Sequence, residues 1–151
     1  MQLDKLNLLY RQLILENAAH PQHYGHLANS SYHLMLRNPT CGDTINVEMV
    51  FQAEKVAEIA FTGQGCTISQ ASASMMTSVL LGQNLVDAKK LIASFSRLIM
   101  GEPISDQENQ ALGDAAVLAS VAEFPTRIRC ATLAWHAADN LLDQYLEKKH
   151  E

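Results

Sequence analysis

The chain of 151 residues has no long hydrophobic run, no excess of positive charge and no Cys-x-x-Cys motif. No apolar stretch approaches the roughly 18 residues that a membrane helix needs, so we expect no membrane-spanning segment. The first residues place no basic patch before an apolar stretch, so we expect no secretory signal and a cytoplasmic location. Sixteen acidic against eleven basic residues give a net charge of -5, which argues against a nucleic-acid-binding protein. The lack of Cys-x-x-Cys excludes a zinc ribbon and a thioredoxin-type redox motif.

The composition is that of a folded protein. Hydrophobic residues make up 48% of the chain and charged residues 18%, so the chain can bury a core and we do not expect disorder. The length suits one domain, and no internal repeat, low-complexity tract or linker divides the sequence. We therefore expect residues 1–151 to form a single domain.

The hydrophobic pattern changes from helical to strand-like and back to helical along the chain. Leucines at helical spacing predict a first helix that ends before Pro21. Apolar residues alternate at 45–51 and again at 56–62, and the short turn between these segments predicts two antiparallel strands. Residues 32–36 are expected to form a further strand, and residues 101–110 a polar loop. Four more helices are expected, at residues 68–81, 85–100, 112–122 and 127–149. The predicted fold class is α+β, with about three antiparallel strands packed against several helices and a long C-terminal helix.

One of the three cysteines lies in a turn between the first two expected strands. Cys41 and Asp43 are two residues apart, so an extended or turning backbone can point both side chains the same way. Gly42 between them allows the chain to bend sharply. A thiolate and a carboxylate presented together suit Zn²⁺ or iron.

The other two cysteines are both expected near the start of a helix. There the positive end of the helix dipole stabilises a thiolate at Cys66, and Arg127 and Arg129 add positive charge beside Cys130. The three thiols together with Asp43 would supply three sulfurs and one oxygen, a complete tetrahedral set for zinc. The alternative interpretation is that Cys66 and Cys130 are small buried hydrophobic residues and that Asp43 is a turn former. Cys41 fits this interpretation less well, because we expect a thiol in a Pro/Gly/Asp turn to be exposed.

Other reactive side chains give weaker indications. His20, His23 and His26 are three residues apart, but Pro21 interrupts the helix that would align them. A polar surface loop is therefore the better interpretation of this segment. A Cys–His hydrolase has little support, because no one of the six histidines is marked as a base for Cys41.

Three motifs, in order along the chain, resemble the signatures of the IscU/NifU-N family of iron–sulfur cluster assembly proteins, and within it the SufU type. They are NPTCGD at residues 38–43, FTGQGCTIS at residues 61–69 and RCATLAW at residues 129–135. The similarity runs from about residue 8 to residue 145. Three matching motifs in the same order are highly specific, so the resemblance covers most of the chain.

Departures from the classical IscU pattern favour the SufU type. Arg129 stands where classical scaffolds carry a histidine, and a charged arginine cannot coordinate a metal. Residues 124–128 do not match the Leu-Pro-Pro-Val-Lys segment through which a dedicated chaperone binds those scaffolds. Residues 101–123 resemble the insertion that is typical of SufU.

The resemblance implies an IscU/SufU-like fold and a site in which Cys41, Asp43, Cys66 and Cys130 bind Zn²⁺. It further implies that Cys41 accepts persulfide sulfur from a PLP-dependent cysteine desulfurase of the SufS type and passes it to the downstream iron–sulfur assembly machinery. An alternative is a scaffold on which the same ligands hold iron or assemble a [2Fe–2S] cluster. A third possibility is a zinc-stabilised adaptor that activates the desulfurase without carrying sulfur.

Overall fold

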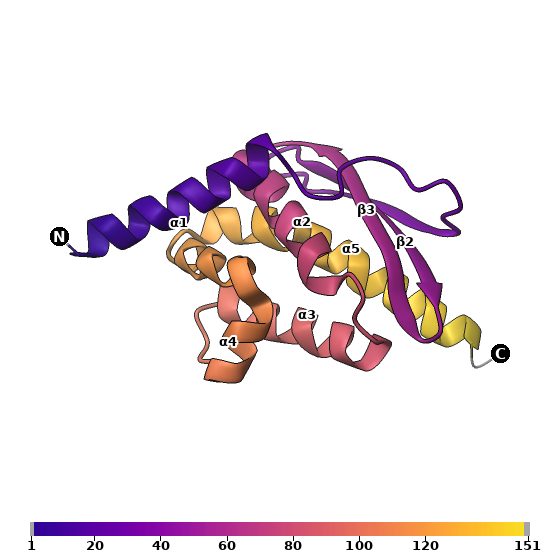
Figure 1. Cartoon of the computed structure of the whole chain (residues 1–151). Coiled ribbons are helices and arrows are strands. Elements are labelled where there is room, and N and C mark those ends of the chain that lie inside the picture. The colour runs from indigo at the N-terminus through magenta and orange to yellow at the C-terminus, as the bar shows by residue number, and fades with distance from the viewer. Residues whose placement is uncertain (1, 150–151) are drawn as a thin grey trace.

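The computed structural model describes residues 2–149, with side chains from residue 8 onward (Figure 1). These residues form five α-helices, one 3-10 helix and a three-stranded sheet. The helices are α1 (Gln2–Ala19), α2 (Thr67–Leu80), α3 (Leu85–Ile99), α4 (Asp106–Leu112), the 3-10 helix η1 (Gly113–Glu123) and α5 (Pro125–Lys149). The strands are β1 (Tyr32–Arg37), β2 (Thr44–Gln52) and β3 (Lys55–Gln64). The predicted α+β class, the three antiparallel strands and the long C-terminal helix are confirmed.

The sheet has the order β1-β2-β3, with both pairs antiparallel. The β2–β3 hairpin turns through Ala53 and Glu54, which both have positive φ, as a tight two-residue turn requires. Alternate residues of β2 point to one face, where Ile45, Val47 and Met49 are fully buried. One face of the sheet is therefore buried in the core.

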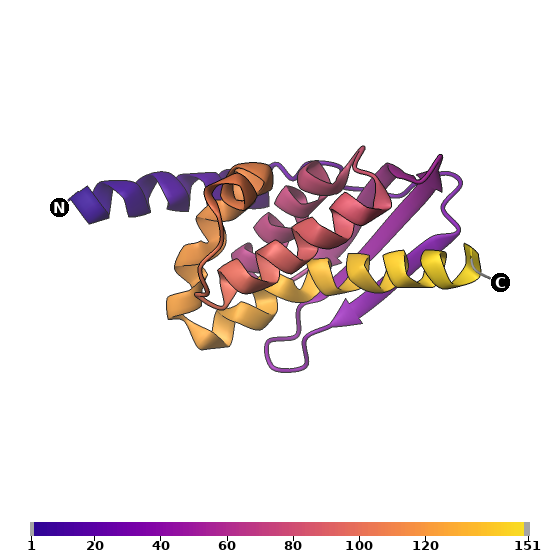
Figure 2. The ribbon, with the colours of Figure 1, turned by 90° about the horizontal axis from the view of Figure 1, so that it is seen from below.

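Helices cover that buried face. α5 packs against β1 and β2, and α2 packs against β3 and α5. Figure 2 shows α5 running along the sheet with α3 beside it. Phe95 of α3 stacks on Trp135 of α5 with ring centroids 4.0 Å apart, and both side chains are fully buried. α1 extends from one end of the body, and the last turns of α5 lie at the other end (Figures 1 and 2). Among residues 2–149, no helix is both long and apolar enough to cross a membrane.

The structure differs from the sequence-based expectation between residues 101 and 127. The expected polar loop contains α4, because Ser105 and Glu108 form a capping box that starts a helix in polar sequence. The next segment is helical, as expected, and its helix is of the 3-10 type (η1). Pro125 does not simply break a helix, since it is the first residue of α5, where a proline lacks no needed N–H. α5 therefore begins two residues earlier than expected.

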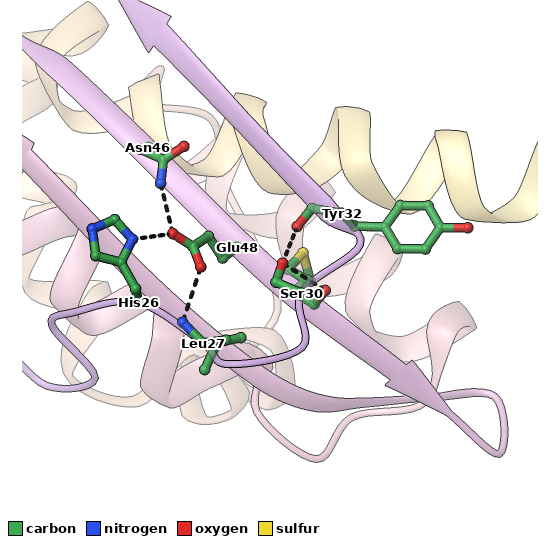
Figure 3. A network of polar contacts seen from close by, with 7 residues as sticks. His26, Leu27, Ser30, Tyr32, Asn46 and Glu48 are labelled. Carbon is green, nitrogen blue, oxygen red and sulfur yellow. Dashed lines mark hydrogen bonds and ion pairs between the residues drawn. The ribbon is translucent and has the colours of Figure 1, made fainter.

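The outer face of the sheet is partly covered by the loop between α1 and β1. Glu48 of β2, only 7% exposed, holds this loop through the contacts drawn in Figure 3. Its carboxylate accepts hydrogen bonds from the Leu27 N–H (2.9 Å) and the Asn46 amide (3.0 Å), and pairs with His26 Nδ1 at 2.5 Å. Burial alone would raise the pKa of Glu48, but the hydrogen bonds from Leu27 and His26 outweigh burial and lower it. The loop histidines do not converge, because His23 contacts Thr77 instead.

Candidate metal centre

The β1–β2 connection is a closed turn that holds Cys41 at its tip. The Asn38 N–H donates to the Asp43 carbonyl at 2.8 Å, and the Gly42 N–H donates to the Asn38 carbonyl at 2.7 Å. Gly42 has φ +78°, a conformation that glycine adopts without strain. The turn leaves Cys41 exposed, as the sequence indicated, and buries Asp43 to 1% exposure.

Asp43 is the residue on which the other predicted ligands converge. Its Oδ2 accepts a hydrogen bond from the Cys41 thiol at 3.0 Å and lies 3.4 Å from the Cys66 sulfur. Its Oδ1 accepts the Cys66 backbone N–H at 2.8 Å. Burial alone would raise the pKa of Asp43, but hydrogen bonds from Cys41 and from the Cys66 N–H outweigh it and hold the pKa below its usual value. The carboxylate therefore stays charged among three thiols.

Gly65 allows the Asp43 carboxylate to lie against the start of α2. A Cβ built on Gly65 would lie 2.1 Å from Asp43 Oδ1 and 2.6 Å from its Cγ, and the glycine has φ +151°. Any side chain at this position would push the carboxylate away. Gly65 also precedes Cys66, which is the N-cap of α2, as the sequence predicted. The chain therefore enters α2 in direct contact with the carboxylate.

Cys130 lies deeper in the structure than the sequence indicated. Because α5 begins at Pro125, Cys130 is the sixth residue of the helix and not one of its first, so the free N–H groups of the helix start do not reach it. The residue is 1% exposed, and burial, followed by hydrogen bonds with Cys41 and Asp43, raises the pKa of its thiol. Without a metal, the Cys130 thiol is therefore neutral.

Three of the four predicted ligand atoms lie close enough together to share one metal ion. The sulfurs of Cys41 and Cys130 are 3.3 Å apart, and the ligand atoms of Cys41, Asp43 and Cys130 all lie within 4.8 Å of one another. A zinc ion with Zn–S bonds of about 2.3 Å would set two sulfurs about 3.8 Å apart. The Cys66 sulfur contacts the carboxylate from outside this trio. The donor types of the trio suit zinc or iron, and the Cys66 sulfur must move toward the trio to complete a set of four ligands.

Two further residues lie against the sulfurs: Asn38, to which the sequence analysis assigned no role, and Arg127, whose positive charge near Cys130 was expected. Asn38 is 3% exposed, and its side-chain N–H₂ group donates to the sulfurs of Cys41 (3.0 Å) and Cys130 (3.8 Å). Arg127 lies beside the thiols. Its nearness to Cys66 and Cys130 raises the pKa of its guanidinium, first through the charge of Cys66 and then through a hydrogen bond with Cys130. The sequence signal for Asn38 was its position at the head of the NPTCGD turn.

The exposure of the sulfurs differs in a way that matters chemically. Cys41 is exposed, Cys66 is intermediate and Cys130 is buried. A reagent that approaches from outside therefore meets the Cys41 sulfur first. The geometry places a buried carboxylate, one buried thiol and one partly exposed thiol behind one accessible thiol.

Comparison with known proteins gives a consistent result. The profile of the NifU-like N-terminal domain matches residues 9–131. The chain is 42% identical over 153 residues to the iron–sulfur cluster assembly scaffold protein IscU of Streptococcus pyogenes serotype M1, covering 99% of this chain and 92% of that protein. It is 40% identical over 134 residues to the zinc-dependent sulfurtransferase SufU of Bacillus subtilis (strain 168), covering 89% of each.

Solved structures share the fold. A candidate iron–sulfur cluster assembly scaffold for the SUF system from Fervidobacterium islandicum AW-1 superposes with a TM-score of 0.82 at 24% identity, covering 89% of this chain and 97% of that one. The profile match spans most of the chain, and both relatives align over nearly all of it. The resemblance carried by the three cysteine motifs is confirmed. The chain belongs to the NifU-like N-terminal domain family, together with the IscU and SufU relatives named above.

Proposed function

We propose that this protein acts in iron–sulfur cluster assembly as a zinc-dependent sulfur acceptor, taking persulfide sulfur onto Cys41 from a PLP-dependent cysteine desulfurase of the SufS type. The observation that carries the proposal is the single exposed thiol in front of otherwise sheltered ligands. The similarity to a zinc-dependent sulfurtransferase over 89% of the chain supports it. Sulfur would then pass from Cys41 to the downstream assembly machinery.

The residues that would hold Zn²⁺ are Cys41, Asp43, Cys66 and Cys130. When bound, zinc supplies a positive charge that keeps the thiolates deprotonated at neutral pH. The chain supplies the rest: Asp43 stays ionised, and its Oδ1 is held by the Cys66 N–H so that Oδ2 faces the thiols. The ligands come from three separate segments, so metal binding would also join the β1–β2 turn to α2 and α5.

The transfer step is a thiolate displacement. The Cys41 thiolate attacks the outer sulfur of the donor's persulfide, a new S–S bond forms at Cys41, and the old S–S bond breaks with its electron pair leaving on the donor cysteine. No external oxidant or reductant is needed, because one persulfide replaces another. The Asn38 amide, 3.0 Å from the Cys41 sulfur, orients the attacking atom.

A [2Fe–2S] scaffold is the second candidate. Iron accepts the same three thiolates and carboxylate. The 42% identity to an IscU scaffold over 99% of the chain favours it. Arg129 argues the other way, because it stands beside Cys130 and cannot serve as a cluster ligand or proton donor in place of a histidine. Transfer therefore ranks first.

The deciding experiment is desulfurase turnover with and without the zinc-loaded protein, beside the Cys41→Ala variant with its zinc content measured. Stimulation that is lost in Cys41→Ala, with a persulfide trapped on Cys41 by alkylation and mass spectrometry, supports transfer. Stimulation that survives the substitution would indicate an adaptor. No stimulation by the metallated protein, with a stable and transferable cluster after anaerobic reconstitution, would establish the scaffold instead.

A further inference from the structure

Positive charge gathers in a cavity beside the thiols, although the protein as a whole is acidic. The cavity has a volume of about 220 Å³ and is lined by Arg37, Arg129 and His136, and no acidic side chain of the described residues forms part of its wall. The chain carries a net charge of -5, so the two arginines make this cavity locally opposite in charge to the protein as a whole. We call this cavity the cationic pocket, after its two arginines, Arg37 and Arg129.

The fold brings the three side chains together from two elements. Arg37 is the last residue of β1, and α5 packs against β1. Arg129 and His136 are seven residues apart on α5, which places them on the same face of the helix two turns apart. All three side chains are exposed, so the pocket is open to a partner.

The arginines of the pocket have no ion-pair partner within the part of the chain whose side chains are described. The ion pairs found among residues 8–149 involve His26, Lys89, Arg97 and Lys149. Cationic groups held close together repel one another unless an anion lies between them. The arrangement therefore leaves two guanidinium groups available to an external carboxylate.

The pocket adjoins the reactive sulfur. Asn38 forms part of the cavity wall and also donates its amide hydrogens to the sulfurs of Cys41 and Cys130. One side chain therefore separates the cationic pocket from Cys41. A protein that brings a persulfide to Cys41 must also lie over or beside the pocket.

We propose that the cationic pocket binds carboxylate side chains of the cysteine desulfurase while its persulfide reaches Cys41. The inference rests on the proposed function, since it assigns a docking contact to that same partner. Guanidinium groups bind carboxylates through paired, charge-assisted hydrogen bonds, which fix orientation as well as proximity. Arg129 then has a role that a histidine ligand could not perform, namely to align the donor beside Cys41.

The test compares two double charge reversals of equal size. Arg37→Glu with Arg129→Glu reverses the pocket, and Lys55→Glu with Lys90→Glu makes the same change at exposed lysines of β3 and α3 that line no part of it. Binding to the purified desulfurase is measured by calorimetry, and stimulated turnover is measured against protein concentration. We expect the pocket variant to raise the Kd and the half-saturating concentration about tenfold or more, and the control to change both less than about threefold.

The outcomes separate this inference from the proposed function. Equal binding by wild type and the pocket variant, equal weakening in both double variants, or no binding by wild type would each overturn the inference. Selective loss of binding without any stimulated turnover by wild type would keep the docking contact and overturn sulfur transfer. Zinc content and Tm check folding, and the neutral Arg37→Gln with Arg129→Gln variant, expected to weaken binding to a smaller extent, replaces the reversal if it does not fold.

Discussion

Replacing Gly65 by alanine tests whether the approach of Asp43 to the α2 start forms the metal site. The new Cβ would lie 2.1 Å from Asp43 Oδ1, well inside the distance that non-bonded atoms tolerate. The carboxylate must therefore move by about 1 Å or more. That movement breaks its 2.8 Å hydrogen bond with the Cys66 N–H and draws Oδ2 away from the thiols.

The size of the effect follows from these contacts. Losing a hydrogen bond to a charged group costs about 1.5–3 kcal/mol of folding free energy. Losing an outer contact that orients a metal ligand lowers metal affinity by about 10–100-fold. The φ of +151° adds backbone strain for alanine. Gly82→Ala is the matched control, because Gly82 also has positive φ (+82°) but a Cβ at that position would meet no atom within 4 Å.

Zinc affinity is measured by competition with a chromophoric chelator, and the free energy of unfolding of the zinc-free protein by urea titration. We expect Gly82→Ala to lose stability through strain, about 1–2 kcal/mol, while binding zinc normally. Gly65→Ala should lose both stability and zinc affinity. If Gly65→Ala binds zinc as tightly as Gly82→Ala, the carboxylate is not a ligand held by this contact and the reasoning fails.

Three further predictions concern charge. Zinc binding at pH 7.5 should release about one more proton from the wild type than from Cys130→Ala, because burial raises the pKa of Cys130 and its thiol is protonated until metal binds. Calorimetry in buffers of different ionisation enthalpy measures the number of protons released, and equal release from the two proteins would contradict the prediction. Glu48→Gln should destabilise the zinc-free protein most near neutral pH. Because the folded-state pKa of Glu48 is lowered, the stability that its charge contributes is present above the usual value of 4.5 and is lost as the pH falls below it, so the urea-derived difference should shrink there; a difference independent of pH refutes the role of the charge. Arg127→Gln should weaken zinc binding several-fold while Arg127→Lys retains it, because the positive charge lies beside the Cys66 and Cys130 thiolates. A chelator titration that finds equal zinc affinity in the wild type and both variants would exclude the effect.

The hydrophobic periodicity of the sequence was sufficient to predict those helices and strands that have one buried face. The alternation in β2 exists because Ile45, Val47 and Met49 fill the core side of the sheet, so the strand could be predicted from the hydrophobic pattern alone. α4 could not, because its residues are polar and its start depends on the local capping box of Ser105 and Glu108. The sequence contained that signal, but a polar stretch with a proline favours a loop.

Some features of the site could be predicted from the local sequence, and others depend on tertiary structure. Cys41 and Asp43 share one turn, so their proximity is a local property of the chain. The environment of Cys130 depends on where α5 begins and on what packs over it, which is tertiary information. The cationic pocket joins the end of β1 to a face of α5, elements far apart in sequence, so no spacing along the chain indicates it.

The site separates the residue that reacts from the residues that hold the site together. Asp43 keeps its position through the Cys66 N–H and through the turn bond from Asn38, and neither contact involves the Cys41 side chain. Cys130 is anchored inside a helix. The Cys41 sulfur can therefore leave the ligand set, or carry an added sulfur, while the other three donors stay in place. For the same reason Cys41→Ala should fold and keep the carboxylate and two thiols together, so loss of sulfur transfer in that variant would report on chemistry and not on collapse of the site.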